Sequence, residues 1–396
     1  MDKKAFFVKR INFLTLSAWL IASIFIATTA LIWFGQDFRG YYAAARVVLA
    51  GGNPYDYHTL APMLLKITGR TGNNPYYYAP WFAWFIIPLA WLPFGIARSL
   101  WMLLNLILWD FSLWQLSNLL NWPKLGWRRW LLFLLATVVF AWITWRYEQT
   151  GILLFALLIQ TLIAIRNDRK ILSGIWLALL FIKPNITLIP VIAISLWLIR
   201  RRNWKPVFIM CISMLLLLIV TTIVTPSWYR PFLEPGFGQG LFNELNGPGQ
   251  IVAYRINTTL SDWLIMLHVN DFYRYTISIL VFFIGLVILS INSWKSESLI
   301  QVVVVSLLVN FGITPYALQY DFPPLALVLF WTIALSQYVR IKWVKVFGTI
   351  IIVFITSVLF WERPISDGYW IVIGLIGLTL LSWHYVDKIN IPSYLL

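Results

Sequence analysis

Apolar runs about as long as a membrane is thick recur from one end of this 396-residue chain to the other. A helix needs roughly 20 apolar residues to cross a bilayer. The runs that we interpret as candidate spans are 11–34, 80–94, 96–118, 130–146, 150–165, 171–182, 185–199, 207–225, 273–292, 298–313, 322–339, 345–361 and 368–386. This pattern predicts an all-α, polytopic membrane protein with about 12–13 transmembrane helices.

Two polar stretches interrupt the apolar runs. Residues 35–79 are rich in polar, aromatic and glycine residues and contain a predicted helix at 38–50, which a Gly-Gly-Asn-Pro sequence ends. Because its charged and apolar residues fall on opposite faces, we expect this helix to lie along the membrane interface. Residues 226–258 are rich in proline, glycine and aromatics. We therefore predict one integral-membrane domain, 1–396, with 35–79 and 226–258 as its first and second extracytoplasmic loops.

Composition and charge agree with a membrane protein. Hydrophobic residues make up 60% of the chain and charged residues 11%, whereas about a quarter of a soluble domain is charged. The net charge of +15 comes from basic clusters between apolar runs, where the positive-inside rule expects them in cytoplasmic loops, so nucleic acid is not a predicted partner. The single cysteine, Cys211, allows no intramolecular disulfide.

The orientation of the chain raises one conflict. With every basic cluster inside, the spans alternate consistently from residue 119 to the C-terminus and both polar loops lie outside. If Asp37 is outside and Lys124 is inside, an odd number of crossings separates them, yet 80–94 and 96–118 look like two. Because 80–94 is short and contains three prolines, either it is re-entrant or the basic loop after 118 lies outside. Both termini look cytoplasmic, which favours about 12 crossings.

Ionisable residues outside the basic loops mark function in a membrane protein, and the alternation of spans brings them to the outer side. They are Asp37, Arg39, Arg46, Asp56, His58, Glu148, Lys183, Glu234, Glu244, Arg255, Asp262 and Asp321. One carboxylate base together with cations for a phosphate leaving group suits sugar transfer from a lipid phosphate. The cations can neutralise the developing charge without a metal, and the Asp-x-Asp motif typical of metal–nucleotide-sugar sites is absent. We therefore expect no cofactor.

The first polar loop also resembles a known family. The segment Asp37-Phe38-Arg39-Gly40-Tyr41-Tyr42-Ala43-Ala44-Ala45, followed by Leu49-Ala50-Gly51-Gly52-Asn53-Pro54-Tyr55, is similar to the first outer loop of glycosyltransferase family 87. The resemblance extends over about residues 30 to 330. It continues in Tyr76–Trp81, Pro88–Pro93, Ile182-Lys183-Pro184 and Asn257–Leu260, and more weakly in Glu148-Gln149 and in Thr314-Pro315-Tyr316 ahead of Tyr320-Asp321.

This resemblance implies a GT-C-type, multi-pass enzyme of the cell membrane, bacterial by expectation. It would move a hexose, mannose in this family, from a polyprenyl-phosphate donor to a glycan or glycolipid acceptor on the extracytoplasmic face, with inversion. The position of Asp37 would be the catalytic base. The donor phosphate would contact Lys183, Arg255 and Arg39. The substrate pocket would be lined by Tyr41, Tyr42, Tyr78, Glu148, Gln149, Asn257, Tyr320 and Asp321.

Each candidate residue also has a simpler explanation. Asp37 can cap the predicted interfacial helix by accepting backbone N–H bonds, and Lys183 can be a lysine that snorkels from the end of a span. The remaining candidates would then be solvated charges or helix ends: Glu148, Gln149, Arg255 and Asp321.

Two other functions compete with sugar transfer from a lipid phosphate. A transporter or flippase usually contains internal repeats with helix breaks in matching halves, and the breaks in this chain are not paired. A glycan ligase or polymerase that uses a lipid diphosphate has the same broad architecture, and the block that begins at Asp37 argues against it.

Overall fold

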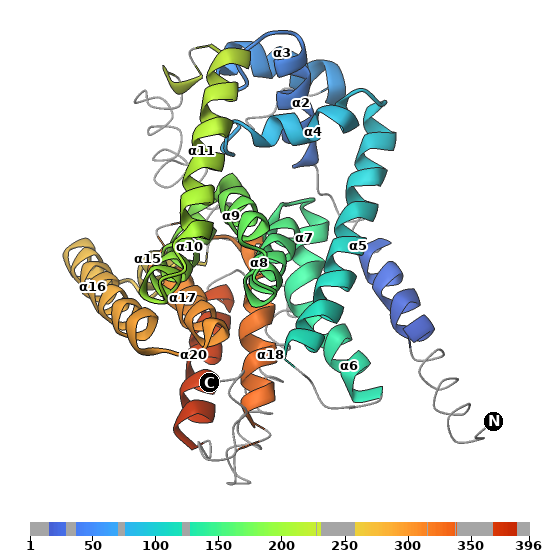
Figure 1. Ribbon diagram of the computed structural model, residues 1–396. Coiled ribbons are helices and arrows are strands. Elements are labelled where there is room, and N and C mark those ends of the chain that lie inside the picture. Colours follow the sequence, from blue (N-terminus) through green and yellow to red (C-terminus); the bar gives the residue numbers. More distant parts are fainter. Residues whose placement is uncertain are drawn as a thin grey trace.

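Helices make up nearly all of the regular structure in the computed structural model, which describes residues 16–28, 37–69, 76–120, 127–226, 228–230, 258–314, 316–336, 338 and 367–385 (Figure 1). After an apolar helix Leu16–Thr28, the elements are α2 (Phe38–Leu49), α3 (Tyr57–Thr68), α4 (Phe82–Ala90), α5 (Phe94–Leu119), α6 (Trp127–Ala136), the π-helical turn η1 (Thr137–Ala141), α7 (Trp142–Arg146), α8 (Gly151–Arg166), α9 (Lys170–Leu179), the 3-10 turn η2 (Leu180–Ile182), α10 (Pro184–Arg200), α11 (Lys205–Val224), α15 (Leu260–Met266), α16 (Asp271–Lys295), α17 (Leu299–Ile313), the 3-10 turn η3 (Gln319–Asp321), α18 (Leu325–Ser336) and α20 (Asp367–Tyr385).

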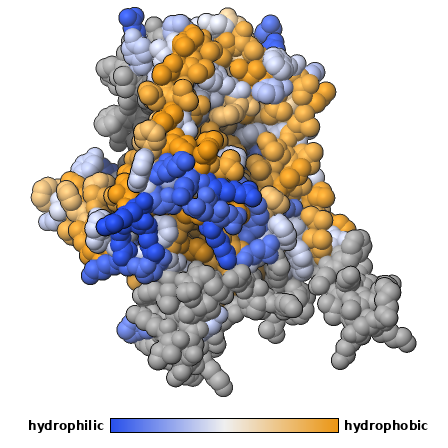
Figure 2. Space-filling model, viewed as in Figure 1, coloured by the Kyte–Doolittle hydropathy of each residue, from blue (hydrophilic) through white to orange (hydrophobic). Residues whose placement is uncertain are grey.

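The lengths and surfaces of these helices confirm the predicted class, a polytopic helical membrane protein. Three of them, α5, α11 and α16, are long and apolar enough to cross a membrane, and shorter apolar helices accompany them. Few residues of α11 and α16 are buried, and large apolar side chains such as Ile223 and Phe272 are exposed. An apolar surface of this extent suits contact with lipid tails rather than with water, and Figure 2 shows it over α11 and α5. The predicted run at 345–361 lies outside the described residues.

The run at 80–94 does not form a membrane span. Its helix, α4, has nine residues, about 14 Å of helix, and packs against α2. Pro88 lies inside α4, and Pro93 is the N-cap residue of α5. Figure 1 shows α2, α3 and α4 together at the end of the molecule where α5 begins. The structure therefore gives 80–94 a short helix packed on α2, and the choice between a re-entrant segment and an outside basic loop stays a prediction.

A single long helix, α5, connects the group formed by α2, α3 and α4 with the end of the molecule that carries the basic clusters. At its start, the ring of Phe94 stacks on Phe38 of α2, with centroids 6.1 Å apart. At its end, the Leu119 carbonyl accepts a hydrogen bond of 2.7 Å from Arg166, a member of a basic cluster. One crossing therefore separates the Asp37 end of the molecule from a basic cluster, which is the odd number that the charge pattern requires.

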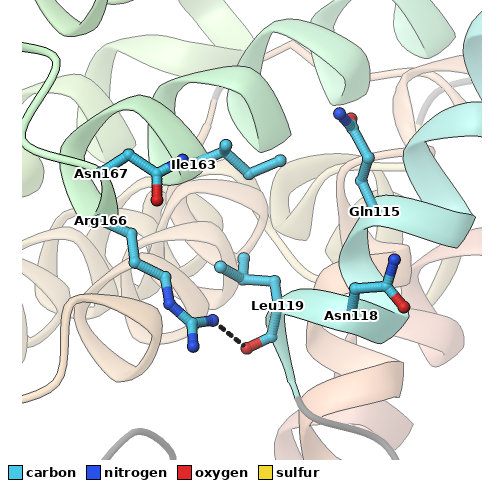
Figure 3. Close-up of a pocket in the computed structure, with 6 residues that line it drawn as sticks. All are labelled: Gln115, Asn118, Leu119, Ile163, Arg166 and Asn167. Carbon is cyan, nitrogen blue, oxygen red and sulfur yellow. Dashed lines mark hydrogen bonds between the residues drawn. The ribbon is translucent and has the colours of Figure 1, made fainter.

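The basic clusters meet at the other end of the helices. Arg200 and Arg201, at the end of α10, form ion pairs with Glu297, which lies between α16 and α17. Figure 2 shows hydrophilic residues over α8, α10 and α17. A pocket of about 380 Å³ also lies at this end, where α5 and α8 finish; it is lined by Gln115, Asn118, Leu119, Ile163, Arg166 and Asn167 (Figure 3).

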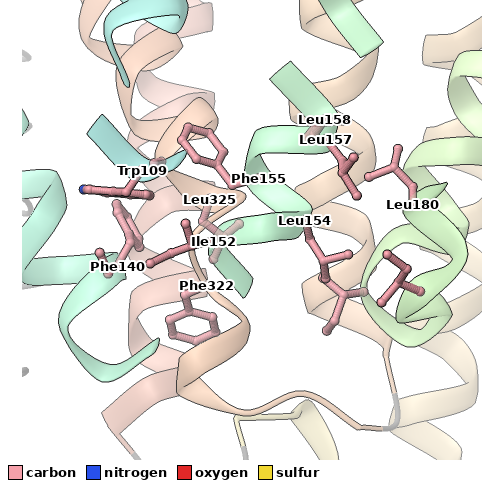
Figure 4. Close-up of a cluster of buried hydrophobic side chains, with 14 of the residues drawn as sticks. Trp109, Phe140, Ile152, Leu154, Phe155, Leu157, Leu158, Leu180, Phe322 and Leu325 are labelled. Atoms are coloured by element: carbon pink, nitrogen blue, oxygen red, sulfur yellow. The ribbon is translucent and has the colours of Figure 1, made fainter. Parts of the chain in front are cut away.

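The core between α5, η1, α8 and α18 holds the site in place. Trp109 and Phe155 pack against each other with Phe140 and Leu325 nearby (Figure 4), and the two rings of the first pair are tilted, with centroids 5.2 Å apart. A polar contact also crosses this core, because Trp109 donates a hydrogen bond of 2.8 Å to Thr137 in the π-helical turn. Such turns insert an extra residue into a helix and often occur near functional sites.

The predicted helix at 38–50 is present as α2, and Gly51 ends it with a φ of +74°. The face expected to be polar is more covered than the pattern suggests. Ala43, on that face, is fully buried, and Arg46 donates a hydrogen bond of 3.2 Å to the Ala90 carbonyl at the end of α4. Because α3 and α4 both pack on α2, this helix is covered by its two neighbours and is not exposed along the membrane interface as expected.

Candidate active site

Segments far apart in the sequence meet at the beginning of α2. Asp37 immediately precedes α2, Gln149 comes just before α8, Lys183 separates η2 from α10, and Asp321 ends η3. Each of them lies at a helix end opposite the basic loops. Tyr78, in the turn before α4, completes the cluster through hydrogen bonds to this group. The structure thus brings together Asp37, Lys183 and Asp321, three of the ionisable residues that the sequence analysis placed on one side of the membrane.

Asp37 is the N-cap residue of α2, but its carboxylate does not cap the helix. Its side chain makes no capping hydrogen bond, although its backbone carbonyl accepts one of 3.0 Å from Gly40. The carboxylate instead accepts a 2.6 Å hydrogen bond at Oδ2 from Nε2 of Gln149. The capping explanation for Asp37 is therefore wrong.

The surroundings of Asp37 favour a basic carboxylate. Burial raises the pKa of Asp37 above its ordinary value of 3.8, while the hydrogen bond from Gln149 and the charges of Arg39 and Lys183 act in the opposite direction. A carboxylate whose pKa is raised by burial binds a proton more readily, which is what general-base catalysis requires.

Gln149 links Asp37 to two tyrosines. Its carbonyl oxygen Oε1 accepts hydrogen bonds from Tyr41 at 2.9 Å and from Tyr78 at 2.5 Å. The two tyrosine hydroxyls are themselves 2.7 Å apart. The tyrosine rings meet edge to face, with centroids 4.8 Å apart, so aromatic packing from α2 and from the turn before α4 fixes both hydroxyls.

Glu148 occupies an unusual backbone position behind Gln149. Its φ is +56°, a left-handed value that only a small share of non-glycine residues adopt. Its side chain is buried and pairs with Arg98 of α5 at 2.5 Å, and its backbone carbonyl accepts a 2.9 Å hydrogen bond from Trp101. Burial raises the pKa of Glu148 to about 7, against the influence of Arg98 and of the Phe38 backbone. These contacts fasten the turn that carries Gln149 to α5.

Lys183 and Asp321 form a buried ion pair on the other side of the cluster. The ammonium lies 2.5 Å from Oδ1 of Asp321, and Oδ2 accepts a 3.1 Å hydrogen bond from the Leu318 backbone. Lys183 is 7% exposed and Asp321 is fully buried. The ammonium also lies 4.8 Å and 5.6 Å from the ring centroids of Tyr320 and Tyr78, within the range of cation–π attraction. A snorkelling lysine would extend to the surface, so that explanation of Lys183 is wrong.

Comparison with protein families identifies the class of this chain. The model of glycosyltransferase family 87 matches residues 76–313, which is more than half of the 396 residues. The chain belongs to glycosyltransferase family 87. No curated protein and no solved structure matches it. Membership confirms the resemblance and makes the chain a membrane-bound glycosyltransferase, which acts on a sugar donor and an acceptor.

The match to family 87 covers part of the cluster. Tyr78, Gln149 and Lys183 lie inside the matched range, whereas Asp37 and Asp321 lie outside it. The latter two join the site through the contacts described above, one to Gln149 and one to Lys183. The geometry thus adds both carboxylates, and with them Tyr41 and Tyr320, to the site members that fall within the family match.

Not every predicted site residue of this family 87 protein points to the cluster. The hydroxyl of Tyr42 donates a 2.7 Å hydrogen bond to the Leu92 carbonyl, between α4 and α5, so this side chain packs among α2, α4 and α5. Arg39 is half-buried on the first turn of α2, and its charge reaches Asp37. Arg255 and Asn257 lie outside the described residues.

One charged residue escaped the sequence analysis. Arg98 lies in the apolar run 96–118 and pairs with Glu148. An arginine within a candidate span is itself a signal of function or of a buried partner, and this rule could have found it.

Proposed function

We propose that this family 87 enzyme transfers a hexose, specifically mannose, from a polyprenyl-phosphate donor to a glycan or glycolipid acceptor on the extracytoplasmic side of the membrane. The transfer inverts the anomeric carbon. The observation that carries the proposal is the Asp37 carboxylate in a family 87 chain: it is half-buried, its pKa is raised by burial, and among the described residues it accepts a hydrogen bond only from Gln149. A second carboxylate oxygen is thus left for an acceptor hydroxyl.

The proposed step uses Asp37 as its only base. Asp37 takes the proton of the acceptor hydroxyl, whose oxygen attacks the anomeric carbon of the donor. The bond from that carbon to the phosphate oxygen breaks, and the electron pair leaves with the polyprenyl phosphate. Because phosphate departs without a general acid, one positioned carboxylate is sufficient for inversion.

Two nearby cations support a phosphate site. Lys183 and Arg39 both lie close enough to Asp37 to influence its pKa, so a donor phosphate bound between them would lie next to the base. The pairing of Lys183 with Asp321 leaves that pair without net charge. Its ammonium would attract a phosphate by sharing its N–H donors, while Arg39 would add a second positive charge. Arg255 stays a prediction for the same phosphate.

A transporter does not fit a chain of this family. A ligase or polymerase that uses a lipid diphosphate remains distinguishable by its donor, and the assay below separates the two.

The test is a donor comparison with purified protein in lipid nanodiscs. Polyprenyl-phosphate mannose, polyprenyl-phosphate glucose, GDP-mannose and a lipid-diphosphate glycan are each supplied with a panel of lipid and glycan acceptors, and radiolabelled transfer is measured. We expect transfer from polyprenyl-phosphate mannose that persists in EDTA. Transfer only from GDP-mannose or from the diphosphate, or loss in EDTA that Mg²⁺ or Mn²⁺ restores, would contradict the proposal.

The donor role of Lys183 needs variants that respect its ion pair. Lys183→Ala alone would leave Asp321 buried and unpaired, which typically costs about 3–5 kcal/mol, so a lost activity would not identify the cause. Lys183→Arg keeps the charge, and the double variant Lys183→Met with Asp321→Asn removes both charges. We expect partial donor affinity in the first and weak donor affinity in the second, with little change in acceptor affinity. Unchanged donor binding in the double variant would place the phosphate elsewhere.

A further inference from the structure

We propose that Gln149 is a positioning residue for the base: its amide keeps the Asp37 carboxylate ionised and aimed, while Tyr41 and Tyr78 fix which end of the amide faces it. This inference rests on the proposed function, because it assigns to Gln149 a role through Asp37 and not a contact with the sugar.

The hydrogen bonds around Gln149 leave one amide orientation for an ionised base. The amide nitrogen donates to Oδ2 of Asp37 at 2.6 Å, and the amide oxygen accepts from the two tyrosines. A reversed amide would place its carbonyl oxygen against the carboxylate, where two acceptors repel each other. It would also turn its N–H groups toward the two hydroxyls, and since one hydroxyl can donate to the other, at least one hydroxyl proton would need another acceptor.

The number of hydroxyl protons limits how the carbonyl of Gln149 can be satisfied. Three oxygen atoms, those of Tyr41, Tyr78 and Gln149, lie within hydrogen-bonding distance of one another, yet the two hydroxyls supply only two protons. In any arrangement that satisfies the carbonyl of Gln149, at least one hydroxyl proton is directed at it. Both hydroxyls belong to buried residues, so leaving the carbonyl unsatisfied would cost free energy.

The reversed amide becomes possible only when Asp37 is protonated. A protonated Asp37 can donate to the carbonyl of Gln149, whose nitrogen can then donate to the tyrosines. The orientation of the amide is therefore coupled to the charge of Asp37, and the two tyrosines favour the orientation that matches the ionised base.

Other charged and titratable groups also face Asp37. They come from α2, from the turns before α4 and α8, from the start of α10 and from η3: Arg39, Tyr41, Tyr78, Tyr147, Glu148, Lys183, Tyr320 and, through Lys183, Asp321. A substitution at Gln149 replaces none of these groups, although it removes the acceptor of the Tyr41 and Tyr78 hydroxyls.

The variants separate loss of the Gln149 hydrogen bond from a change of side-chain shape and from the loss of a glutamine elsewhere in the protein. Gln149→Leu removes the hydrogen bond, and Gln149→Glu keeps the shape but places a second carboxyl group against Asp37. Gln160→Leu is the matched control, because Gln160 lies in the following helix α8 and its amide donates to Gln115 at the far end of the molecule. Tyr78→Phe tests the hydroxyl that orients the amide.

Two readouts are measured for each variant. The first is the acidic limb of the pH–rate profile of sugar transfer. The second is the protonation of Asp37 itself, followed by infrared spectroscopy of protein labelled with ¹³C-aspartate and assigned by its loss in Asp37→Asn. The second readout does not depend on activity.

We expect both midpoints to rise by about one pH unit in Gln149→Leu, the size of shift that loss of one strong hydrogen bond to a carboxylate produces. Gln149→Glu should shift them further, because two close carboxyl groups share one proton, and Tyr78→Phe less. The donor KM should stay near the wild-type value while kcat falls at low pH. Gln160→Leu should match the wild type.

An Asp37 midpoint that is unchanged in Gln149→Leu would overturn the inference, whatever Gln149→Glu shows, because a nearby second carboxyl group is enough to shift the latter. If the leucine variant does not fold, an unchanged midpoint in Tyr78→Phe would overturn it. A shifted Asp37 midpoint in a protein that transfers no sugar from any donor would support the positioning role of Gln149 and contradict the proposed function. The two failures are thereby distinguished.

Discussion

The two carboxylates of the cluster, Asp37 and Asp321, are held in opposite ways. Asp37 is half-buried and receives its hydrogen bond from the neutral amide of Gln149. Asp321 is fully buried, pairs with the ammonium of Lys183 and also accepts a backbone hydrogen bond. Asp37 therefore keeps the raised pKa that burial gives it and one oxygen without a described donor, whereas both oxygens of Asp321 are held by fixed donors.

This difference assigns different tasks to the two carboxylates. Asp37 keeps the properties that a base needs, namely partial access, an oxygen available to the acceptor and a pKa raised by burial. Asp321 uses both oxygens on fixed partners and serves to hold Lys183. The comparison predicts that substitutions at Asp37 change rates and substitutions at Asp321 change stability.

The largest expected effect is on the rate of transfer. Asp37→Asn keeps the shape of the side chain but cannot accept a proton, and loss of a positioned base typically lowers the rate by about 10²–10⁴-fold. The matched control is Asp56→Asn in the same loop, where the carboxylate caps α3 by accepting from the His58 backbone and asparagine caps about equally well. Turnover of Asp37→Asn within a few-fold of wild type would remove Asp37 from the base role.

The second effect is on stability. Asp321→Asn leaves the Lys183 ammonium without its counter-ion in a buried site, and breaking a buried pair costs about 3–5 kcal/mol. Adding Lys183→Met should recover much of that loss, because the pair is then removed as a whole. Thermal unfolding in detergent measures both variants. An Asp321→Asn protein as stable as the wild type would mean that Asp321 is not needed to hold Lys183.

A third test disturbs the contact between the turn that carries Gln149 and η3, which carries Asp321. A Cβ at Gly151, the first residue of α8, would lie 2.3 Å from the Tyr320 carbonyl and 2.9 Å from Pro323, so Gly151→Ala should push η3 away from the turn that carries Gln149. We expect a loss of about 1–3 kcal/mol and reduced transfer. Gly312→Ala in α17 is the control, since a Cβ there would meet no neighbouring side chain or helix within 4 Å, and it should be neutral or stabilise by about 0.5–1 kcal/mol.

The smallest effect is a pH dependence of stability. Because burial raises the folded-state pKa of Asp37 above 3.8, its contribution to stability is fully present below pH 3.8 and is lost as the pH rises through the folded pKa. Asp37→Asn cannot ionise, so at neutral pH it should be slightly more stable than the wild type, with the difference vanishing in acid. A variant that is less stable than wild type at neutral pH would contradict this sign.

The regular architecture was predictable because it depends on local sequence. Long, mainly apolar runs mark α5, α11 and α16, and the glycine pair after residue 50 marks the end of α2. The run at 80–94 was ambiguous for a physical reason: it is apolar enough for a span, but its prolines shorten the helix to nine residues. Only the packing of this helix, α4, against α2 shows that it belongs with α2 and α3.

Several residues of the candidate site could be picked out from the sequence, but their contacts could not. Asp37, Gln149, Lys183 and Asp321 all stood out as polar residues at the ends of apolar runs. Their pairing depends on how helices pack, and nothing local to Lys183 indicates that its partner lies 138 residues further along the chain. Arg98 was missed for the same reason, because its partner Glu148 lies 50 residues away.

The distance along the chain between Lys183 and Asp321 has a consequence for synthesis. A ribosome that adds about 5–20 residues per second needs roughly 7–28 seconds to reach Asp321 after Lys183. Until then the hairpin of α9 and α10 holds a lysine whose permanent counter-ion does not yet exist, while Asp37 and Gln149 are already present. Nascent chains should therefore bring the base and its amide together first and acquire a charge-balanced site only late. That interval is when an insertion factor, a lipid phosphate or water would have to stabilise Lys183.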